Sequence, residues 1–429
     1  MTILIILIFI IGYGMIVFEH PLKMDKTIPA ILMGILCWTC IALANLPISD
    51  HTSIDQALQF HLGQTSEILI FLLGAMTIVE LVDLHKGFNV ITNRIHTRKK
   101  ITLLWTISWM TFFLSAVLDN LTTTIVMLSL IRKLMNDRND RLWYASFIVI
   151  ASNAGGAWTP IGDVTTTMLW IDGKVSALKL IENLALPSLL CLAVPLILAG
   201  FLSVFKGSLQ LHEASHQDLK AEKVMSSKIM LIAGVSALLF VPVFKTITHL
   251  PPWTGMMIGL AFVWIVSEIV DPEDNITPDR KHKYSAKHAL SRIELPSILF
   301  FLGILTAINA LESIGILHHL STWLDQMIPS KDIIAMLIGV FSAVIDNVPL
   351  VAAAIGMYDV PMDAKLWHFI AFSAGTGGSM LIIGSAAGVA AMGIEKIDFI
   401  WYLKKISWLA ALGFIAGCLG VIAMDAMLA

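Results

Sequence analysis

Long apolar runs are the feature that most restricts how this chain can fold. A helix needs about 20 apolar residues to cross the hydrocarbon core of a bilayer, so each such run is a candidate membrane span. The sequence contains ten of them, near residues 3–18, 27–46, 66–84, 142–171, 185–205, 229–247, 253–270, 294–314, 366–392 and 403–425. Composition agrees, because 57% of the residues are hydrophobic and only 14% are charged. We therefore expect an all-α polytopic membrane protein.

Basic residues indicate the side of the membrane that each loop faces, because loops rich in Lys and Arg tend to stay in the cytoplasm. Six loops hold 23 of the 28 Lys and Arg residues: 19–26, 85–100, 132–141, 206–228, 271–293 and 393–405. Loop 47–65 contains neither Lys nor Arg. This distribution predicts a multi-pass protein whose N- and C-termini both lie outside.

Two further segments do not fit as crossings. Residues 101–131 lie between Arg98-Lys99-Lys100 and Arg132-Lys133, and both basic clusters prefer the cytoplasm. The segment must therefore enter the membrane and return, as a re-entrant hairpin does. Such a hairpin is tolerated only where its non-helical tip is buried in protein or lines a wet cavity. Residues 334–358 follow the same pattern from the opposite face.

The tips of both hairpins carry the same polar cluster, S-A-V-aliphatic-D-N. The first copy is Ser115-Ala116-Val117-Leu118-Asp119-Asn120, and the second is Ser342-Ala343-Val344-Ile345-Asp346-Asn347. An Asp at the centre of a membrane helix costs about 2.5–3.5 kcal/mol on insertion scales, so such an acid marks a functional site by default. Neither tip contains a basic residue, and we expect both acids to be unpaired. A structural acid paired with a buried Lys is the alternative.

Two more pairs of segments extend the duplication. Residues 73–83 are similar to residues 302–312, and residues 152–163 are similar to residues 372–385 through G-G-x5-G. The side assignment makes the helix at 66–84 run inward and its counterpart at 294–314 run outward. Inverted repeats with interrupted helices are typical of secondary transporters with alternating access. We therefore expect ten transmembrane helices in a 5+5 inverted repeat with two re-entrant hairpins and two broken helices.

The domain boundaries follow from this arrangement. The prediction is a first repeat over 1–205 (scaffold helices 1–84, hairpin 101–131, broken helix 142–171), a cytoplasmic linker over 206–228, and a second repeat over 229–429 (hairpin 334–358, broken helix 366–392).

The glycine-rich stretch at 153–163 predicts where the first broken helix unwinds, because Gly155-Gly156 is followed by Pro160 and Gly162. Unwinding frees backbone carbonyls, which join side-chain oxygens as ligands for small hard cations. Close helix packing at glycines is the simpler alternative, but the repetition at 375–384 favours an ion site. The candidate cation or proton ligands are Asp119, Asn120, Thr123, Asn153, Thr159, Asp163, Thr166, Ser342, Asp346, Asn347 and Ser379.

Proton and cation are expected to compete for one site, because an unpaired carboxylate in a low-dielectric environment favours its protonated form. The position of Asp163 is taken by Ser385 in the second repeat. The first repeat should therefore dominate cation binding, and mutating Asn120 should impair transport more than mutating Asn347. We predict that Na⁺ binds at Asp119, Asn120, Asn153, Asp163 and Asp346.

Glu80 and Asp83 are candidates for the access path or for a response to pH. They lie three residues apart on one helical face. Asp83 is close to the predicted cytoplasmic end of its helix, where a solvated end residue is the simpler interpretation.

The hairpin clusters, the run N-A-G-G-A-W-T-P-I-G-D-V-T-T-T and the run G-T-G-G-S-M-L-I-I-G-S resemble the NhaD-type sodium/proton antiporters of the ion transporter superfamily, over nearly the whole chain. The resemblance implies Na⁺ efflux against proton entry in pH homeostasis, a bacterial cytoplasmic (inner) membrane, and a homodimeric scaffold with a moving, elevator-type transport domain. In dicarboxylate-carrying relatives the hairpin motif is Ser-Asn-Thr. Here Asp119 and Asp346 stand at the serine position. In the second hairpin, Val348 stands where the motif would place a threonine after Asn347.

Exchange of Na⁺ or Li⁺ for H⁺ is therefore the predicted function, with monovalent cations, protons and membrane lipid as partners. No nucleic acid, no cofactor and no enzymatic activity are expected. A cation-coupled carrier of a dicarboxylate or arsenite is the alternative, against which the lack of a basic anion clamp at the tips counts. From another class, Gly162-Asp163 with a second membrane Asp suggests an intramembrane aspartyl protease, in which the duplicated hairpins would have no role.

Overall fold

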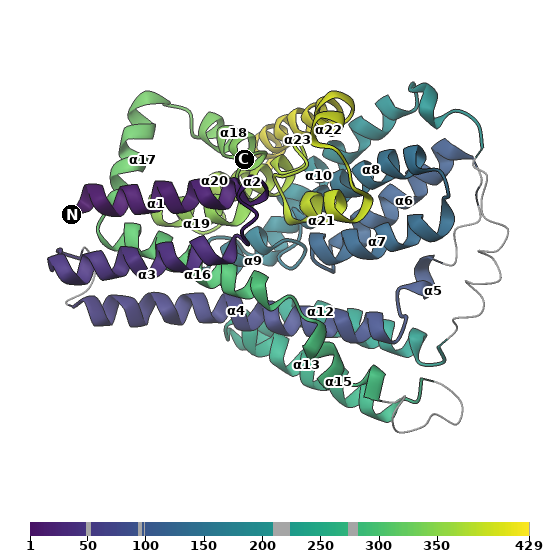
Figure 1. Cartoon of the computed structure of the whole chain (residues 1–429), viewed down its shortest axis with the longest axis horizontal. Coiled ribbons are helices and arrows are strands. Elements are labelled where there is room, and N and C mark those ends of the chain that lie inside the picture. The colour runs from purple at the N-terminus through teal and green to yellow at the C-terminus, as the bar shows by residue number, and fades with distance from the viewer. Residues whose placement is uncertain (49–52, 93–96, 98, 209–223, 273–281, 429) are drawn as a thin grey trace.

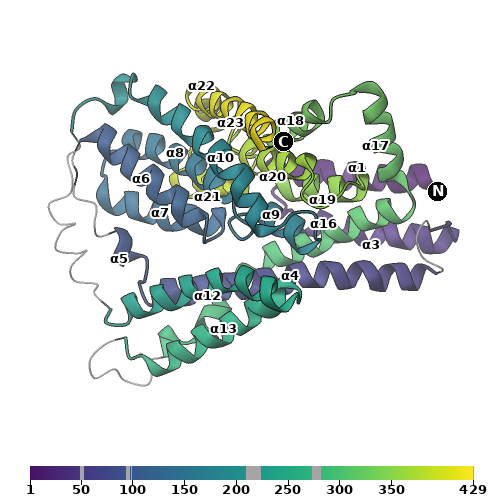
Figure 2. The same cartoon turned by 180° about the vertical axis from the view of Figure 1, so that it is seen from behind.

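The computed structural model describes residues 1–48, 53–92, 97, 99–208, 224–272 and 282–428. Within these ranges the chain forms a bundle of helices, and most of the long ones run roughly along one axis (Figures 1 and 2). The start of α1 and the start of α4 lie at one end of the bundle, while α5 and α15 lie at the other end.

The helices of the first half are α1 (Thr2–Val17), α2 (Glu19–Leu22), α3 (Thr27–Ala44), α4 (Ile54–Leu84), α5 (Asn89–Thr92), α6 (Lys100–Ser115), α7 (Asn120–Leu134), α8 (Arg138–Gly156), α9 (Val164–Ile171), α10 (Ala177–Ala199) and η1 (Ser203–Phe205). The helices of the second half are α12 (Ser227–Thr248), α13 (Pro252–Ile269), η2 (His282–Tyr284), α15 (Ala286–Arg292), α16 (Leu295–Ser313), α17 (Ile316–Met327), α18 (Lys331–Ser342), α19 (Asn347–Met357), α20 (Lys365–Gly377), α21 (Ala386–Glu395), α22 (Phe399–Lys405) and α23 (Ser407–Leu428).

Six helices of the described chain are long and apolar enough to cross a membrane: α3, α10, α12, α13, α16 and α23. These helices also expose large apolar side chains, such as Ile232 of α12 (61% exposed) and Ile265 of α13 (59%). A soluble protein rarely presents so much apolar surface to water, whereas a bilayer solvates it. The chain is therefore an all-α polytopic membrane protein, as the sequence predicted.

The interruptions in the helices fall where the sequence places them. Residues 116–119 separate α6 from α7, and residues 343–346 separate α18 from α19. The long span at 142–171 is divided into α8 and α9, and the span at 366–392 into α20 and α21. Figure 1 shows α6 and α7 side by side toward one end of the bundle, and α18 and α19 toward the other.

Two elements differ from the sequence interpretation. The span at 66–84 is only the apolar part of α4, which begins at Ile54 because Ser53 caps it by accepting the Gln56 N–H at 3.3 Å. The search for apolar runs missed α17, which is amphipathic and has 12 residues, too few to cross a bilayer.

N-cap side chains fix where the helices restart near the middle of the bundle. Asp119 accepts the N–H of Thr122 at 2.8 Å and Asp163 accepts the N–H of Thr165 at 3.2 Å, which caps α7 and α9. Ser385 caps α21 in the same way through the N–H of Gly388 at 3.1 Å. Because each cap satisfies N–H groups that the first turn leaves free, the N-termini of these helices are held at the interruptions.

Matching contacts join hairpin and broken helix in the two halves. The Ser115 hydroxyl donates to the Ser152 carbonyl at 2.6 Å, and the Ser342 hydroxyl donates to the Ala374 carbonyl at 2.7 Å. A Cβ on Gly155 of α8 would overlap the Phe112 carbonyl of α6.

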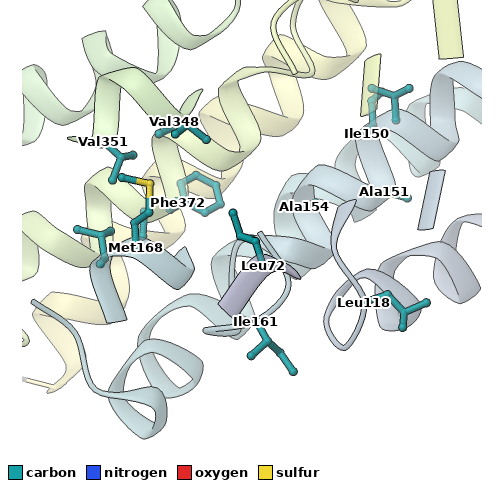
Figure 3. Close-up of a cluster of buried hydrophobic side chains, with 14 of the residues drawn as sticks. Leu72, Leu118, Ile150, Ala151, Ala154, Ile161, Met168, Val348, Val351 and Phe372 are labelled. Atoms are coloured by element: carbon teal, nitrogen blue, oxygen red, sulfur yellow. The ribbon is translucent and has the colours of Figure 1, made fainter. Parts of the chain in front are cut away.

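The second half repeats that close approach, since a Cβ on Gly377 of α20 would overlap the Gly339 carbonyl of α18. Only glycine lets the backbones come this close. An apolar core surrounds these crossings; Figure 3 shows part of it, with side chains from α8, α9, α19 and α20 and with Leu72 of α4.

Candidate ion-binding site

A cavity lies where the two hairpin tips and the break between α8 and α9 meet α4 and α16. Its volume is about 90 Å³. Its polar lining consists of Lys26, Asp119, Asn120, Thr122, Asp163, Thr167, Ser297, Asp346 and Asn347. Its remaining wall is apolar and includes Leu72 and Ile161, both labelled in Figure 3. Three carboxylates therefore share one small cavity with a single lysine.

Asp163 is the most deeply placed of these acids, with 2% of the residue exposed. The amide of Asn120, from the first tip, donates to its Oδ2 at 3.2 Å. The amide of Asn347, from the second tip, donates to the same oxygen at 3.2 Å. Among the described residues no Lys, Arg or His pairs with this carboxylate. The structure thus brings both tips and the broken helix together at Asp163.

Asn153 lies directly behind this group and does not line the cavity. Its Oδ1 accepts from the Asn120 amide at 3.1 Å, and its own amide donates to the hydroxyls of Ser379 and Ser385 at 2.9 Å each. Asn153 therefore links Asn120 of the first half to the second break, between α20 and α21. Its role is to orient Asn120, because a hydrogen-bonded partner fixes the direction of the amide.

Asp119 lies half-buried at the wall of the cavity. Besides capping α7, its carboxylate accepts the Thr122 hydroxyl at 2.5 Å. No described basic residue pairs with it, which agrees with the sequence expectation for this acid. Its bonds to Thr122 leave lone pairs free, because a carboxylate offers about four acceptor sites.

Asp346 does not fit that expectation. Its Oδ2 lies 3.0 Å from the Nζ of Lys26, which precedes α3, so the prediction of an unpaired acid is wrong here. The physical reason is that the partner comes from a distant part of the chain, 320 residues away. The absence of basic residues within the tip says nothing about which loop packs against it.

Most of the predicted hydroxyl ligands are engaged elsewhere. Thr159 donates to the Ala116 carbonyl at 2.6 Å, Thr166 to the Asp163 carbonyl at 2.9 Å and Ser342 to the Ala374 carbonyl. Thr123 is fully buried but does not line the cavity. These side chains hold the hairpins and breaks in shape; they do not face the cavity.

Two neighbouring threonines, Thr122 and Thr167, line the cavity instead. Each lies one residue away from a predicted ligand, Thr123 or Thr166. Which of two adjacent threonines faces the cavity depends on how the helix is rotated about its axis, and the caps at Asp119 and Asp163 determine that rotation. Phe300 and Phe301 of α16 also line the cavity and were missed, because nothing in a uniformly apolar helix marks the face that a site uses.

Glu80 and Asp83 lie outside the cavity lining. Glu80 Oε1 lies 3.0 Å from the Nε of Arg292 on α15, so it forms an ion pair between α4 and the second half of the chain. Asp83 is one turn further along the same helix and is partly exposed. Neither contacts the group around Asp163 directly.

The donor set consists of hard oxygen ligands. Among the described residues, no three His, Cys, Asp or Glu side chains form a group that could hold a metal ion by themselves. Carboxylate, amide and hydroxyl oxygens are hard ligands, the kind that alkali and alkaline-earth cations prefer. A group of acids with amide neighbours can therefore hold either a small cation or a proton.

Comparisons with known proteins agree with this interpretation. Residues 5–369 match the citrate transporter family. The chain is 48% identical to sodium/proton antiporter 1 of Arabidopsis thaliana, over 97% of this chain and 72% of that protein, and 46% identical to sodium/proton antiporter 2 of the same plant, over 97% and 98%. It is 31% identical to the Na⁺/H⁺ antiporter NhaD of Vibrio cholerae, over 93% and 87%.

The fold, the buried polar site and these matches define a polytopic membrane transporter, so the aspartyl-protease hypothesis is excluded. The chain belongs to the citrate transporter family and, within it, to the NhaD-type sodium/proton antiporters that its motifs resemble.

Proposed function

We propose that the protein exchanges Na⁺, and also Li⁺, for H⁺ by secondary active transport. The relatives named sodium/proton antiporters support this function. The observation that carries it is Asp163, a buried carboxylate that accepts amide hydrogens from both hairpin tips and pairs with no described base. A buried charge without a partner is costly, so such a group binds either a cation or a proton.

The geometry explains why the two ions would exclude each other. When Asp163 is ionised, its oxygens can bind a cation together with the amide and hydroxyl oxygens nearby. When it is protonated, the attraction for a cation is lost. The N-termini of α7, α9 and α19 point toward the cavity, and their positive ends oppose a cation there. Asp119 and Asp163, when ionised, would outweigh that effect, because each then carries a full negative charge.

We further propose that transport uses alternating access by ten crossings in a 5+5 inverted repeat, with α6–α7 and α18–α19 as re-entrant hairpins. The matched contacts of the two halves support a duplication. The boundaries proposed for it are 1–205 and 229–429, with a linker at 206–228. Displacement of the group α6–α9 and α18–α21 against α3, α4 and α16 would move the cavity between the two faces, as in an elevator.

The expected setting is a cytoplasmic membrane in which both termini lie outside and two copies pair as a homodimer. Orientation can be tested with a membrane-impermeant thiol reagent on intact cells. It should label Leu250→Cys between α12 and α13 and spare Lys206→Cys, and the reverse pattern would overturn the orientation.

A cation-coupled anion carrier is the second candidate, because the matching family is described as citrate transporters and helix N-termini can bind anions. Three carboxylates against one lysine in the cavity oppose anion binding by charge repulsion. Uptake of citrate or succinate that depends on Na⁺ would favour this candidate.

The decisive experiment measures proton flux in proteoliposomes while Na⁺, Li⁺ or K⁺ is added. Na⁺ and Li⁺ should collapse an imposed proton gradient, and K⁺ should not. Asp163→Asn keeps the shape of the side chain and removes its charge, so it should abolish the flux, and Asp119→Asn should reduce it. Undiminished Na⁺-dependent flux in Asp163→Asn would rule out the central role of this carboxylate.

A further inference from the structure

Lys26 is the one basic side chain that lines the cavity among the described residues. It stands in the short connection between α2 and α3, and its Nζ lies 3.0 Å from Asp346 Oδ2 and 4.3 Å from the centre of the Phe300 ring. The two side chains are mostly buried, with 27% and 15% exposed. The ring face of Phe300 and the carboxylate of Asp346 therefore hold the ammonium on two sides.

The ion pair crosses between two parts of the molecule. Lys26 is fixed at the start of α3, where the Thr27 hydroxyl donates to the Pro296 carbonyl of α16 at 3.1 Å. Asp346 belongs to the second hairpin tip, whose neighbour Asn347 donates to Asp163. The lysine thus connects the α3–α16 pair to the same tip that reaches the buried acid.

The titratable groups around Lys26 belong to two adjoining cavities. Asp346 is in contact with it, Asp119 and Asp163 share the cavity, and Tyr13 and Glu19 line an adjoining cavity that also contains Lys26 and Asp346. One ammonium cannot neutralise three carboxylates, but it can form an ion pair with one of them. Asp346 cannot bind a second cation closely while Lys26 stays in place, because the two positive charges would repel each other.

We propose that Lys26 is an internal counter-cation that occupies Asp346 in the empty transporter and that an entering Na⁺ must displace. This inference rests on the proposed Na⁺/H⁺ exchange. A lysine suits such a task, because its ammonium sits on a flexible four-carbon stem and can swing away without losing its charge. Its departure would also release the second tip from α3 and α16, which couples ion entry to the movement of the hairpin.

The test measures the half-saturating Na⁺ concentration and the maximal rate of proton flux in proteoliposomes at about pH 8.5, where exposed carboxylates are ionised. Lys26→Gln removes the competing charge, so the half-saturating Na⁺ concentration should fall by about three- to tenfold. Lys26→Arg should raise it, because a guanidinium can bind the carboxylate with two hydrogen bonds. A purely structural lysine would give no such opposite changes.

Lys365→Gln is the matched control. Lys365 has the same exposed fraction as Lys26, 27%, and pairs with two aspartates, Asp332 and Asp425, but lies outside the cavity. Its half-saturating Na⁺ concentration should equal that of the wild type.

An unchanged or raised value in Lys26→Gln would overturn the role of Lys26. If that variant does not fold, an unchanged value in Lys26→Arg would overturn it equally. Absence of Na⁺-dependent flux in the wild type would instead contradict the exchange function itself.

Discussion

The two asparagines next to Asp163 are not equivalent at the level of single hydrogen bonds. Asn120 donates to Asp163 and also to Asn153, which is tied to Ser379 and Ser385. Asn347 donates only to Asp163 among the bonds of the described residues. Asn120 is therefore held in a network and Asn347 by a single partner, which gives a physical basis to the predicted asymmetry between the two asparagines.

Asn120→Ala is expected to impair transport more than Asn347→Ala. Loss of Asn120 removes the amide donor of Asn153 Oδ1 and one of the two amide donors of Asp163 Oδ2, and an unsatisfied buried group costs about 1–3 kcal/mol. We expect turnover to fall by about tenfold or more for Asn120→Ala and by about two- to fivefold for Asn347→Ala, measured as Na⁺-dependent proton flux. Asn183→Ala, at a partly exposed position on α10 outside the cavity, serves as control. Equal losses at both positions would contradict the asymmetry.

The residues of the site were predictable where the signal is local and repeated. Asp119, Asn120, Asp163, Asp346 and Asn347 could be identified because two copies of one pattern place acids and amides in apolar segments. The partner of Asp346 could not, because no pattern in the loop before α3 shows that it packs against a tip 320 residues away.

At the scale of helices, the positions of the interruptions could be predicted from glycine, proline and charged residues in the sequence. The lengths of the helices could not always be predicted. The apolar run at 66–84 marks only the part of α4 that contacts lipid or the protein core. The first turns of α4 are polar, and the cap at Ser53 determines where they begin. The close distance between each broken helix and its hairpin was not predictable either, because it depends on which glycines contact the backbone of the other helix.

Gly155→Ala is expected to disrupt the crossing of α8 and α6. Its new methyl group would overlap the backbone carbonyl of Phe112, which cannot move aside as a flexible side chain could. Overpacking of this kind costs about 1–3 kcal/mol, so the melting temperature in detergent should fall clearly.

Gly393→Ala in α21 is the matched control, because a Cβ there meets nothing within 4 Å. It should be neutral or stabilise by about 0.5–1 kcal/mol through helix propensity. A Gly155→Ala protein as stable as the control would show that the backbones separate easily.

At the scale of the whole molecule, the two halves are also joined beyond the cavity, at the end rich in basic loops. His85, which follows α4, is fully buried there. Its Nδ1 accepts from the Ser226 hydroxyl at 2.6 Å, and its Nε2–H donates to the Tyr284 carbonyl at 3.1 Å. The Ser227 hydroxyl in turn donates to the His85 carbonyl at 2.7 Å. One histidine therefore connects the first half, the start of α12 and the segment before α15.

Acidification is expected to weaken this junction. Burial lowers the pKa of His85 below its ordinary value of 6.5, so the folded protein binds a proton here less readily than the unfolded chain does. Its contribution to stability is complete above about pH 6.5 and declines as the pH falls toward the lowered pKa, because the unfolded chain gains a proton first. The melting temperature in detergent should therefore drop between neutral and mildly acidic pH, and His85→Gln, which does not titrate, should drop less. His319→Gln, at an exposed position on α17, should follow the wild type. Identical pH profiles for His85→Gln and the wild type would place the acid sensitivity elsewhere in the molecule.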